Sequence, residues 1–183
     1  AIAAYRAGNA PNIVQVFEVG TATMMSAKGA IKPVYQLMKE SGEKFDHKQY
    51  VSAVAGYYTD RRGNMLSFPF NSSTVVFYIN KDAFKKAGLD PEKAPKTWQE
   101  FAAVAGKLKA SGQACVYTTG WPSWVHVENF SAWHNIPIGT LENGMAGLDT
   151  KFVFNSPQHV AHLQMLVDIT KNGWFTYAGR QNE

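Results

Sequence analysis

The sequence predicts an α/β fold in which mixed, mostly parallel sheets are flanked by helices. Short β-rich segments alternate with helical segments along the 183 residues, and this alternation is typical of parallel strands joined by crossover helices. Neither an internal repeat nor a low-complexity run interrupts the pattern. Because 45% of the residues are hydrophobic, the chain can bury one full core or two small ones.

The first 64 residues predict one helix end, one strand, three further helices and a turn. Residues 1–8 have the pattern of a helix that stops at Gly8. Residues 12–19 are rich in β-branched and aromatic side chains and predict a buried strand. Helices are expected over residues 21–28, 31–41 and 47–58, and a turn over residues 60–64.

A cluster of small polar residues, Asn71 to Thr74, separates two apolar runs. If the two runs belong to two lobes, the cluster is a hinge whose side chains can hydrogen-bond a ligand. We therefore predict one lobe over residues 1–73 and a second lobe over residues 74–183. Hydroxyl residues also commonly cap turns, so the structural and the ligand-binding interpretation of Ser73 both remain open here.

Strand and helix signals alternate again after a β-rich segment that ends at Ile79. Asn80 predicts a helix start, and Thr97 with Glu100 forms a capping box that opens a helix through Ala110. Strands are expected over residues 114–118 and 151–154, with a helix over 121–134 between them. Ser156 and Pro157 start a last helix that ends at Gly173, with an apolar face made of Val160, Leu163, Leu166 and Val167.

Glu18 is the exceptional residue of its predicted strand. A carboxylate near the end of an apolar strand is costly unless it is paired or faces a cleft. In open α/β sheets, ligands bind beyond the carboxyl ends of the strands, where a carboxylate can accept hydrogen bonds from ligand hydroxyls. A solvated strand end or a structural ion pair explains Glu18 equally well, so both interpretations stay open.

Two tryptophans, Trp121 and Trp124, follow the predicted strand over 114–118 through Gly120. Indole rings pack well against the C–H faces of polyols while the N–H finds a polar partner. Core packing is the alternative explanation. We favour a ligand role for this pair because Pro122 and Ser123 between them are typical of a loop.

The sequence offers little support for an enzyme or a nucleic-acid-binding protein. It contains no nucleophile elbow, phosphate-binding glycine loop or zinc-protease motif. His159 and His162 lie three residues apart, but without a carboxylate partner we expect surface or half-buried side chains rather than a metal site. The formal charge of +4 is scattered, which argues against a nucleic-acid groove and suits an anionic ligand.

Longer motifs show a resemblance to a known family. The extracytoplasmic solute-binding proteins of ABC sugar importers are similar to residues 78–91 (YINKDAFKKAGLDP) and 95–101 (PKTWQEF), with the helix that follows. Within that family, the members that bind sn-glycerol 3-phosphate resemble this chain at residues 8–11 (GNAP), 16–25 (VFEVGTATMM), 30–34 (AIKPV), 68–74 (FPFNSST) and 120–124 (GWPSW). The similarity extends along essentially the whole chain.

The resemblance implies two α/β lobes that close on sn-glycerol 3-phosphate or a glycerophosphodiester. It further implies a periplasmic binding protein, neither an enzyme nor a cofactor carrier, that delivers its ligand to the permease and ATPase of an ABC importer. Glu18 matches the acidic residue that holds the glycerol hydroxyls, and Ser73 matches the hinge serine near the polar end of the ligand. Trp121 and Trp124 match the aromatic pair that packs against the glycerol.

We expect the chain to be an internal fragment of such a protein, because it begins with a helix end and stops in a polar connector. The family's other ligand groups have no counterpart in these residues: a Tyr upstream, and a Ser, a Gly, a Tyr and an Arg downstream. Without the Arg, a phosphate loses a bidentate charge-assisted contact. We therefore expect weak or no ligand binding by this chain alone, and self-association through exposed apolar surface.

Three other functions have to be separated from this one. A sugar or oligosaccharide would also fit the tryptophan pair, and a requirement for phosphate distinguishes the two ligand classes. A hydrolase of glycerophosphodiesters needs a metal cluster or an acid–base pair, which the sequence does not show. A purely structural or adhesive domain would leave Glu18 and the tryptophan pair without a role.

Overall fold

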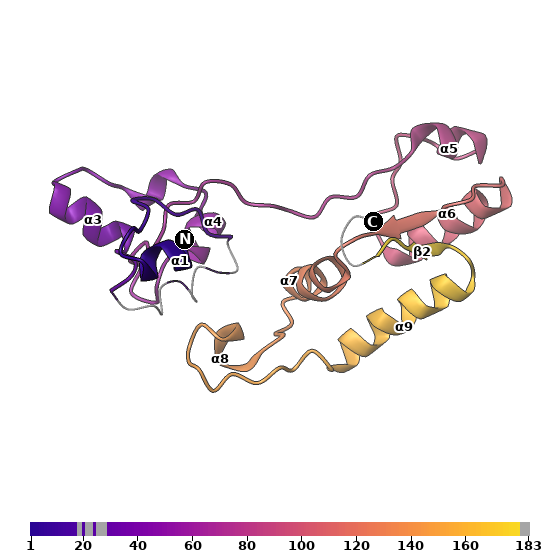
Figure 1. Cartoon of the computed structure of the whole chain (residues 1–183). Helices are drawn as coiled ribbons and strands as arrows, with labels where there is room; N and C mark the ends of the chain where they lie inside the picture. The colour runs from indigo at the N-terminus through magenta and orange to yellow at the C-terminus, as the bar shows by residue number, and fades with distance from the viewer. Residues whose placement is uncertain (18–19, 21–23, 25–28, 180–183) are drawn as a thin grey trace. The chain divides into compact units, whose positions relative to one another are not determined.

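The computed structural model divides between Thr74 and Val75 into two compact units, residues 1–74 and 75–183 (Figure 1). It describes all residues except 18–19, 21–23, 25–28 and 180–183. The division lies one residue from the predicted boundary, and the assignment of the units to two lobes stays a prediction. No helix in the described part of the chain has the length and hydropathy needed to cross a bilayer.

The first unit is built from short helices: α1 (Ile2–Arg6), α3 (Val34–Ser41), the 3-10 helix η2 (His47–Gln49) and α4 (Ser52–Tyr57). The expected helix over 31–41 begins only at Val34, because Pro33 is extended and takes the N-cap position. The expected helix over 47–58 is split, since the backbone is extended at Tyr50 and Val51. The helix predicted over 21–28 lies largely outside the described residues.

One carboxylate holds the turn that was predicted over residues 60–64. Asp60 accepts hydrogen bonds from the backbone N–H groups of Arg62 and Asn64, both at 2.9 Å, and from the Asn64 side chain at 3.0 Å. The turn places Thr59 and Met65 in an antiparallel bridge. Met65 is 1% exposed, and its carbonyl accepts the N–H of Tyr35 at 3.0 Å, which attaches the turn to α3.

Two predicted strands are wrong in the structure. Residues 12–17 and 75–79 have no regular secondary structure, and neither segment is paired as a strand. Ile13, which was expected in a buried strand, is therefore 90% exposed, and Tyr78 is 88% exposed. A β-rich segment becomes a strand only when a neighbour completes its hydrogen bonds, and the described residues supply one sheet of two strands.

The second unit contains all of the described sheet. Its elements are α5 (Lys81–Lys86), α6 (Trp98–Ala110), β1 (Tyr117–Thr119), the π-helix η3 (Ser123–Glu128), α7 (Asn129–Trp133), α8 (Thr140–Asn143), α9 (Pro157–Lys171) and β2 (Phe175–Tyr177). The helix starts at Asn80, Thr97 and Ser156 are confirmed, because each side chain accepts a backbone N–H of its own first turn. The strand predicted over 151–154 is reduced to one bridge, Phe152 with Gly139.

The parallel pair β1–β2 confirms the α/β class and forms one wall of the core. Tyr117 lies opposite Phe175 and Thr119 opposite Tyr177, and α6 and α9 pack against the pair through Phe101, Ala105 and Ile169 (Figure 1). On α6, Phe101, Ala105 and Leu108 are buried, at the spacing that aligns side chains on one helix face. Strand β1 starts at Tyr117, three residues after the predicted start at residue 114.

The buried face of α9 differs from the predicted one. Val160, Leu163 and Val167 are 57%, 43% and 46% exposed; Leu166 alone of the predicted four packs against the core. The helix instead buries His159, His162 and Ile169. The expectation that the two histidines lie at or near the surface is wrong, because aromatic rings of η3, α6 and α7 surround them and offset the cost of burying neutral imidazoles.

We expect Phe101→Ala to lower the free energy of unfolding of the second unit by about 3–5 kcal/mol. Phe101 is 5% exposed and contacts the rings of Trp98 and Tyr117 at centroid distances of 5.6 and 5.1 Å, so truncation leaves a cavity in the core. Urea denaturation followed by near-UV circular dichroism measures the change. Gln99→Ala, an exposed neighbour on the same helix, serves as the control and should change the value by less than about 0.5 kcal/mol.

Candidate functional site

The two tryptophans lie where β1 gives way to helix. We define the tryptophan turn as residues 120–124, the segment that joins Thr119, the last residue of β1, to the first residues of η3. Thr119 is paired with Tyr177 of β2, so the turn stands at the carboxyl ends of two parallel strands. This is the edge at which α/β sheets bind their ligands.

The backbone of the tryptophan turn is strained at Trp121. Its φ is 51°, in the left-handed region that bulky side chains rarely adopt. The carbonyl of Trp121 accepts the N–H of Val125 at 2.9 Å, and Pro122 follows in helical conformation. The helix that follows Trp121 therefore holds the conformation of the turn from its C-terminal side. Non-glycine residues in this region occur often at functional sites, where the surrounding structure holds them.

A π-helix continues from this turn. The N–H of Asn129 bonds the carbonyl of Trp124 across η3, and α7 follows without a break. The helix predicted over 121–134 is therefore correct from Pro122 to Trp133 and wrong at Trp121 and His134. Single π-helical turns are rare and are found mainly at functional sites.

The two tryptophans differ in what they offer to a ligand. Trp121 is 41% exposed, and Trp124 is half-buried. Trp98 has ring contacts with Phe101, Tyr117, His126 and His162, as expected for a core residue. Core packing is also the ordinary sequence interpretation of Trp133, but this side chain is 82% exposed, so that interpretation is wrong.

A polar contact spans the base of the tryptophan turn. The Tyr117 hydroxyl and Nε2 of His126 are 3.4 Å apart, and His126 is 3% exposed. The His126 ring also lies 5.7 Å from the His162 ring of α9 and 6.1 Å from Phe175 of β2. The turn thus rests on side chains from β1, β2, η3 and α9.

Burial shifts the pKa values of Tyr117, His126 and His162, the side chains on which the turn rests. It raises the pKa of the Tyr117 phenol to about 12 and lowers the pKa of His126 below its ordinary value. The pKa of His162 is lowered to about 4, first by burial and then by the imidazoles of His126, His134 and His159. Each shift disfavours the charged form of its group, so Tyr117, His126 and His162 are neutral at pH 7.

His159 is held by two serines. The Ser131 hydroxyl donates to the carbonyl of Val127 and lies 2.8 Å from Nε2 of His159. Because that hydroxyl has a single proton, it accepts from Nε2–H of His159, and Nδ1 of His159 lies 2.7 Å from the Ser156 hydroxyl. Among the described residues no group of three or more His, Cys, Asp or Glu side chains could hold a metal ion.

The other two predicted site residues belong to the first unit. Glu18 lies outside the described residues. Ser73 is exposed in the extended segment just before the division between the units. Trp121 and Trp124, which the second unit brings together on one turn, are therefore the predicted site residues with a defined mutual arrangement.

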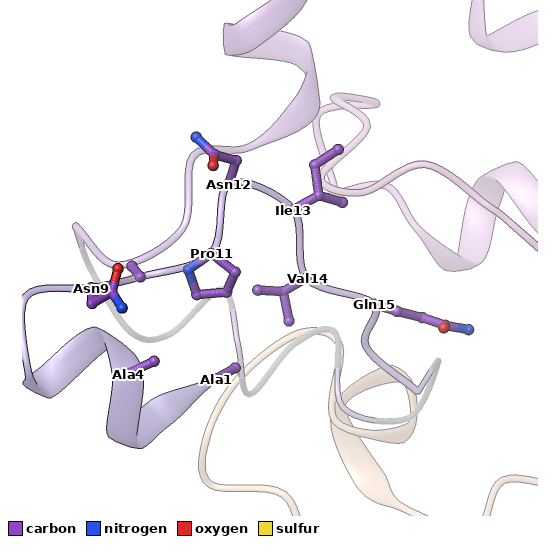
Figure 2. Close-up of a pocket in the computed structure, with 9 residues that line it drawn as sticks. Ala1, Ala4, Asn9, Pro11, Asn12, Ile13, Val14 and Gln15 are labelled. Carbon is purple, nitrogen blue, oxygen red and sulfur yellow. The ribbon is translucent and has the colours of Figure 1, made fainter.

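Hollows in the described part of the chain include one beside α1 and one beside α7. The larger, about 590 Å³, is lined by α1 and residues 9–15; Figure 2 shows Pro11 and Val14 beside it, whereas Asn12 and Ile13 point away from α1. Among the described residues, its lining contains amides and short apolar groups and no charged side chain, which does not suit an anionic ligand. The smaller hollow, about 220 Å³, lies beside α7 and includes Glu128 and Asn135.

Sequence reasoning missed Tyr117, His126 and Tyr177 as neighbours of the tryptophan turn. Tyr177 could have been found from strand order, because a parallel pairing of the two segments places it opposite Thr119, the last residue of β1. No motif in the sequence singled out His126 as a neighbour of the tryptophan turn. Its role depends on the π-helical winding of η3, which no local pattern in the sequence indicates.

Comparison with known proteins gives close matches along this chain. A family profile for bacterial extracellular solute-binding proteins matches residues 2–179. The sn-glycerol-3-phosphate-binding periplasmic protein UgpB of Pectobacterium atrosepticum is 58% identical over 183 residues, which is 100% of this chain and 41% of that protein. UgpB of Escherichia coli K12 is 57% identical over the same 183 residues, 42% of its length, and UgpB of Yersinia pestis bv. Antiqua is 58% identical, again over 42% of its length.

This chain thus spans about two fifths of the length of the curated relatives it matches. The family profile nevertheless covers nearly all of the chain and includes both compact units, the predicted hinge and the tryptophan turn. The chain belongs to the family of bacterial extracellular solute-binding proteins.

Proposed function

We propose that this chain is part of the substrate-binding component of an ABC importer that captures sn-glycerol 3-phosphate in the periplasm. The observation that carries the proposal is the identity of 57–58% to UgpB proteins over every residue of the chain. Glycerophosphodiesters share the glycerol phosphate group and are the second ligand class of this proposal. The role is binding and delivery, with no catalytic step.

The tryptophan turn supports this proposal on chemical grounds. A glycerol backbone presents C–H groups to an indole face and hydroxyls to a carboxylate. Trp121, at the carboxyl end of the parallel pair, exposes its ring for the first contact. Glu18 would accept the hydroxyl hydrogen bonds, and the Ser73 hydroxyl would donate to the polar end of the ligand.

Capture would proceed by closure of two lobes joined through residues 71–74. A ligand that contacts Glu18 and Ser73 in one lobe and the tryptophan turn in the other stabilises only the closed form, in which all contacts are made together. The closed form would then be recognised by the permease and ATPase of the importer. The formal charge of +4 weakly favours the approach of a phosphate.

A sugar-binding protein is the second candidate, since a stacked tryptophan pair also fits a pyranose ring. Calorimetric titration of a full-length protein containing this sequence separates the two. Sn-glycerol 3-phosphate and glycerophosphocholine should bind, and maltose should not. Binding of maltose without binding of the phosphate compounds would replace the proposed ligand class.

We expect Trp121→Ala and Trp124→Ala each to weaken binding of sn-glycerol 3-phosphate about tenfold to a hundredfold, because each removes a large flat contact from the ligand. Isothermal titration of the full-length protein measures the loss. Trp133→Ala is the matched control, since Trp133 is 82% exposed and lies outside the turn; its affinity should stay within about twofold of the wild type. Equal losses in all three variants would contradict the proposal.

Glu18→Gln and Ser73→Ala test the contribution of the first unit. Replacing the carboxylate removes a charged acceptor for ligand hydroxyls, so Glu18→Gln should weaken binding about tenfold or more. Ser73→Ala removes one neutral hydrogen bond and should cost about threefold to tenfold. Ser72→Ala alters the neighbouring hydroxyl and provides the comparison; a larger loss for Ser72→Ala than for Ser73→Ala would assign the hinge contact to the wrong serine.

A further inference from the structure

One hydrogen bond encloses the tryptophan turn. Tyr117, at the start of β1, and His126, in η3, lie on either side of both tryptophans in the sequence, and their side chains meet at 3.4 Å. The contact therefore closes a loop that contains Trp121 and Trp124.

His126 depends in turn on His162 of α9. The two rings are 5.7 Å apart, and the His162 ring stacks on Phe130 of α7 at 4.0 Å with an angle of 11° between the ring planes. His162 is 6% exposed, and its Nε2 is buried without a hydrogen-bond partner. It is thus a neutral imidazole packed as an aromatic ring.

Apart from one backbone hydrogen bond with His126, the surroundings of His162 offer nothing to stabilise a positive charge. The titratable groups near His162 and its neighbour His126 are the phenol of Tyr117 from β1 and the imidazoles of His134 and His159. The charged residues of α6, η3 and α9 are exposed: Glu100, Lys107, Lys109, Glu128, Asp168 and Lys171. A proton on buried Nε2 would lack an acceptor and would lie beside other imidazoles, which is strongly unfavourable.

We propose that His126 and His162 form a pH-sensitive support for the tryptophan turn, which holds the two indoles in the binding conformation only while His162 is neutral. Protonation of His162 is relieved when its ring leaves the stack on Phe130 and reaches water. His126 then loses its neighbour, and the turn is no longer held. Both histidines act as positioning residues, and the proposal rests on the proposed function of the turn in ligand binding.

The direction of the pH effect follows from the proton affinities. The pKa of His162 is lowered from its ordinary 6.5 to about 4 while the ring is packed, so protons bind the released state more tightly than the packed state. The packed state is therefore fully favoured above pH 6.5 and loses its advantage as the pH falls toward 4. Ligand affinity should decline over the same interval.

The test compares sn-glycerol 3-phosphate binding by the wild type and His162→Phe in the full-length protein between pH 7.5 and 4.5. Phenylalanine keeps the stack on Phe130 and cannot take a proton. We expect equal affinities at pH 7.5 and, at about pH 5.5, a wild-type loss up to about tenfold greater than that of the variant. Titration of the ligand phosphate affects both proteins equally and cancels in this ratio.

His47→Phe makes the same change at an exposed histidine of the first unit and should follow the wild-type pH profile. If His162→Phe does not fold, His162→Gln replaces it, because an amide also stays neutral throughout the range. Far-UV circular dichroism at each pH shows whether the protein is folded. Parallel pH profiles of wild type and His162 variant, or loss of affinity only where the fold is lost, would overturn the proposal.

The experiments distinguish a wrong ligand from a wrong role for His126 and His162. If the wild type does not bind sn-glycerol 3-phosphate at pH 7.5, the proposed function fails. Tryptophan fluorescence then tests the support alone: the wild type should show a transition between pH 6.5 and 4 that is absent in the His162 variant. The same transition in both proteins would overturn the support.

Discussion

The second unit depends on the packing of α9 against an aromatic layer. This helix buries two imidazoles and Ile169. Rings from α6, η3 and α7 contact the His162 imidazole, and Tyr117 of β1 contacts the His126 ring of η3. Imidazoles can be buried in this way because the neutral ring behaves as an aromatic group whose polar atoms need few partners. The layer fixes β1 and η3 relative to each other, and hence the turn between them.

Much of the local structure could be predicted from the sequence where the signal is itself local. The starts of α5, α6 and α9 depend on a capping side chain and the next few backbone N–H groups, so Asn80, Thr97 and Ser156 were sufficient to place them. The turn at Asp60 is equally local. The parallel class followed from the order of the segments, and β1–β2 confirms it.

The errors arose where tertiary contacts decide the outcome. Residues 12–17 and 75–79 have strand composition, but strand formation requires a paired neighbour. The apolar face of α9 was misplaced because side-chain type favoured Val160 and Leu163, whereas Phe130 and Ser131 made a better environment for His162 and His159. At the candidate site, the tryptophan pair was recognisable from its loop residues and the family motif, but the supporting His126 was not.

The parallel pairing of β1 and β2 has a consequence for the order of folding. The side chain of Thr118 bonds the carbonyl of Thr176, 58 residues further along the chain, so the strands meet only after a long loop has closed. Such closure is slow unless intervening structure shortens it. Helices α6 and α9 form from local signals and can collapse first. We therefore expect the geometry of the tryptophan turn, which follows β1, to be acquired late, after much of the hydrophobic surface has been buried.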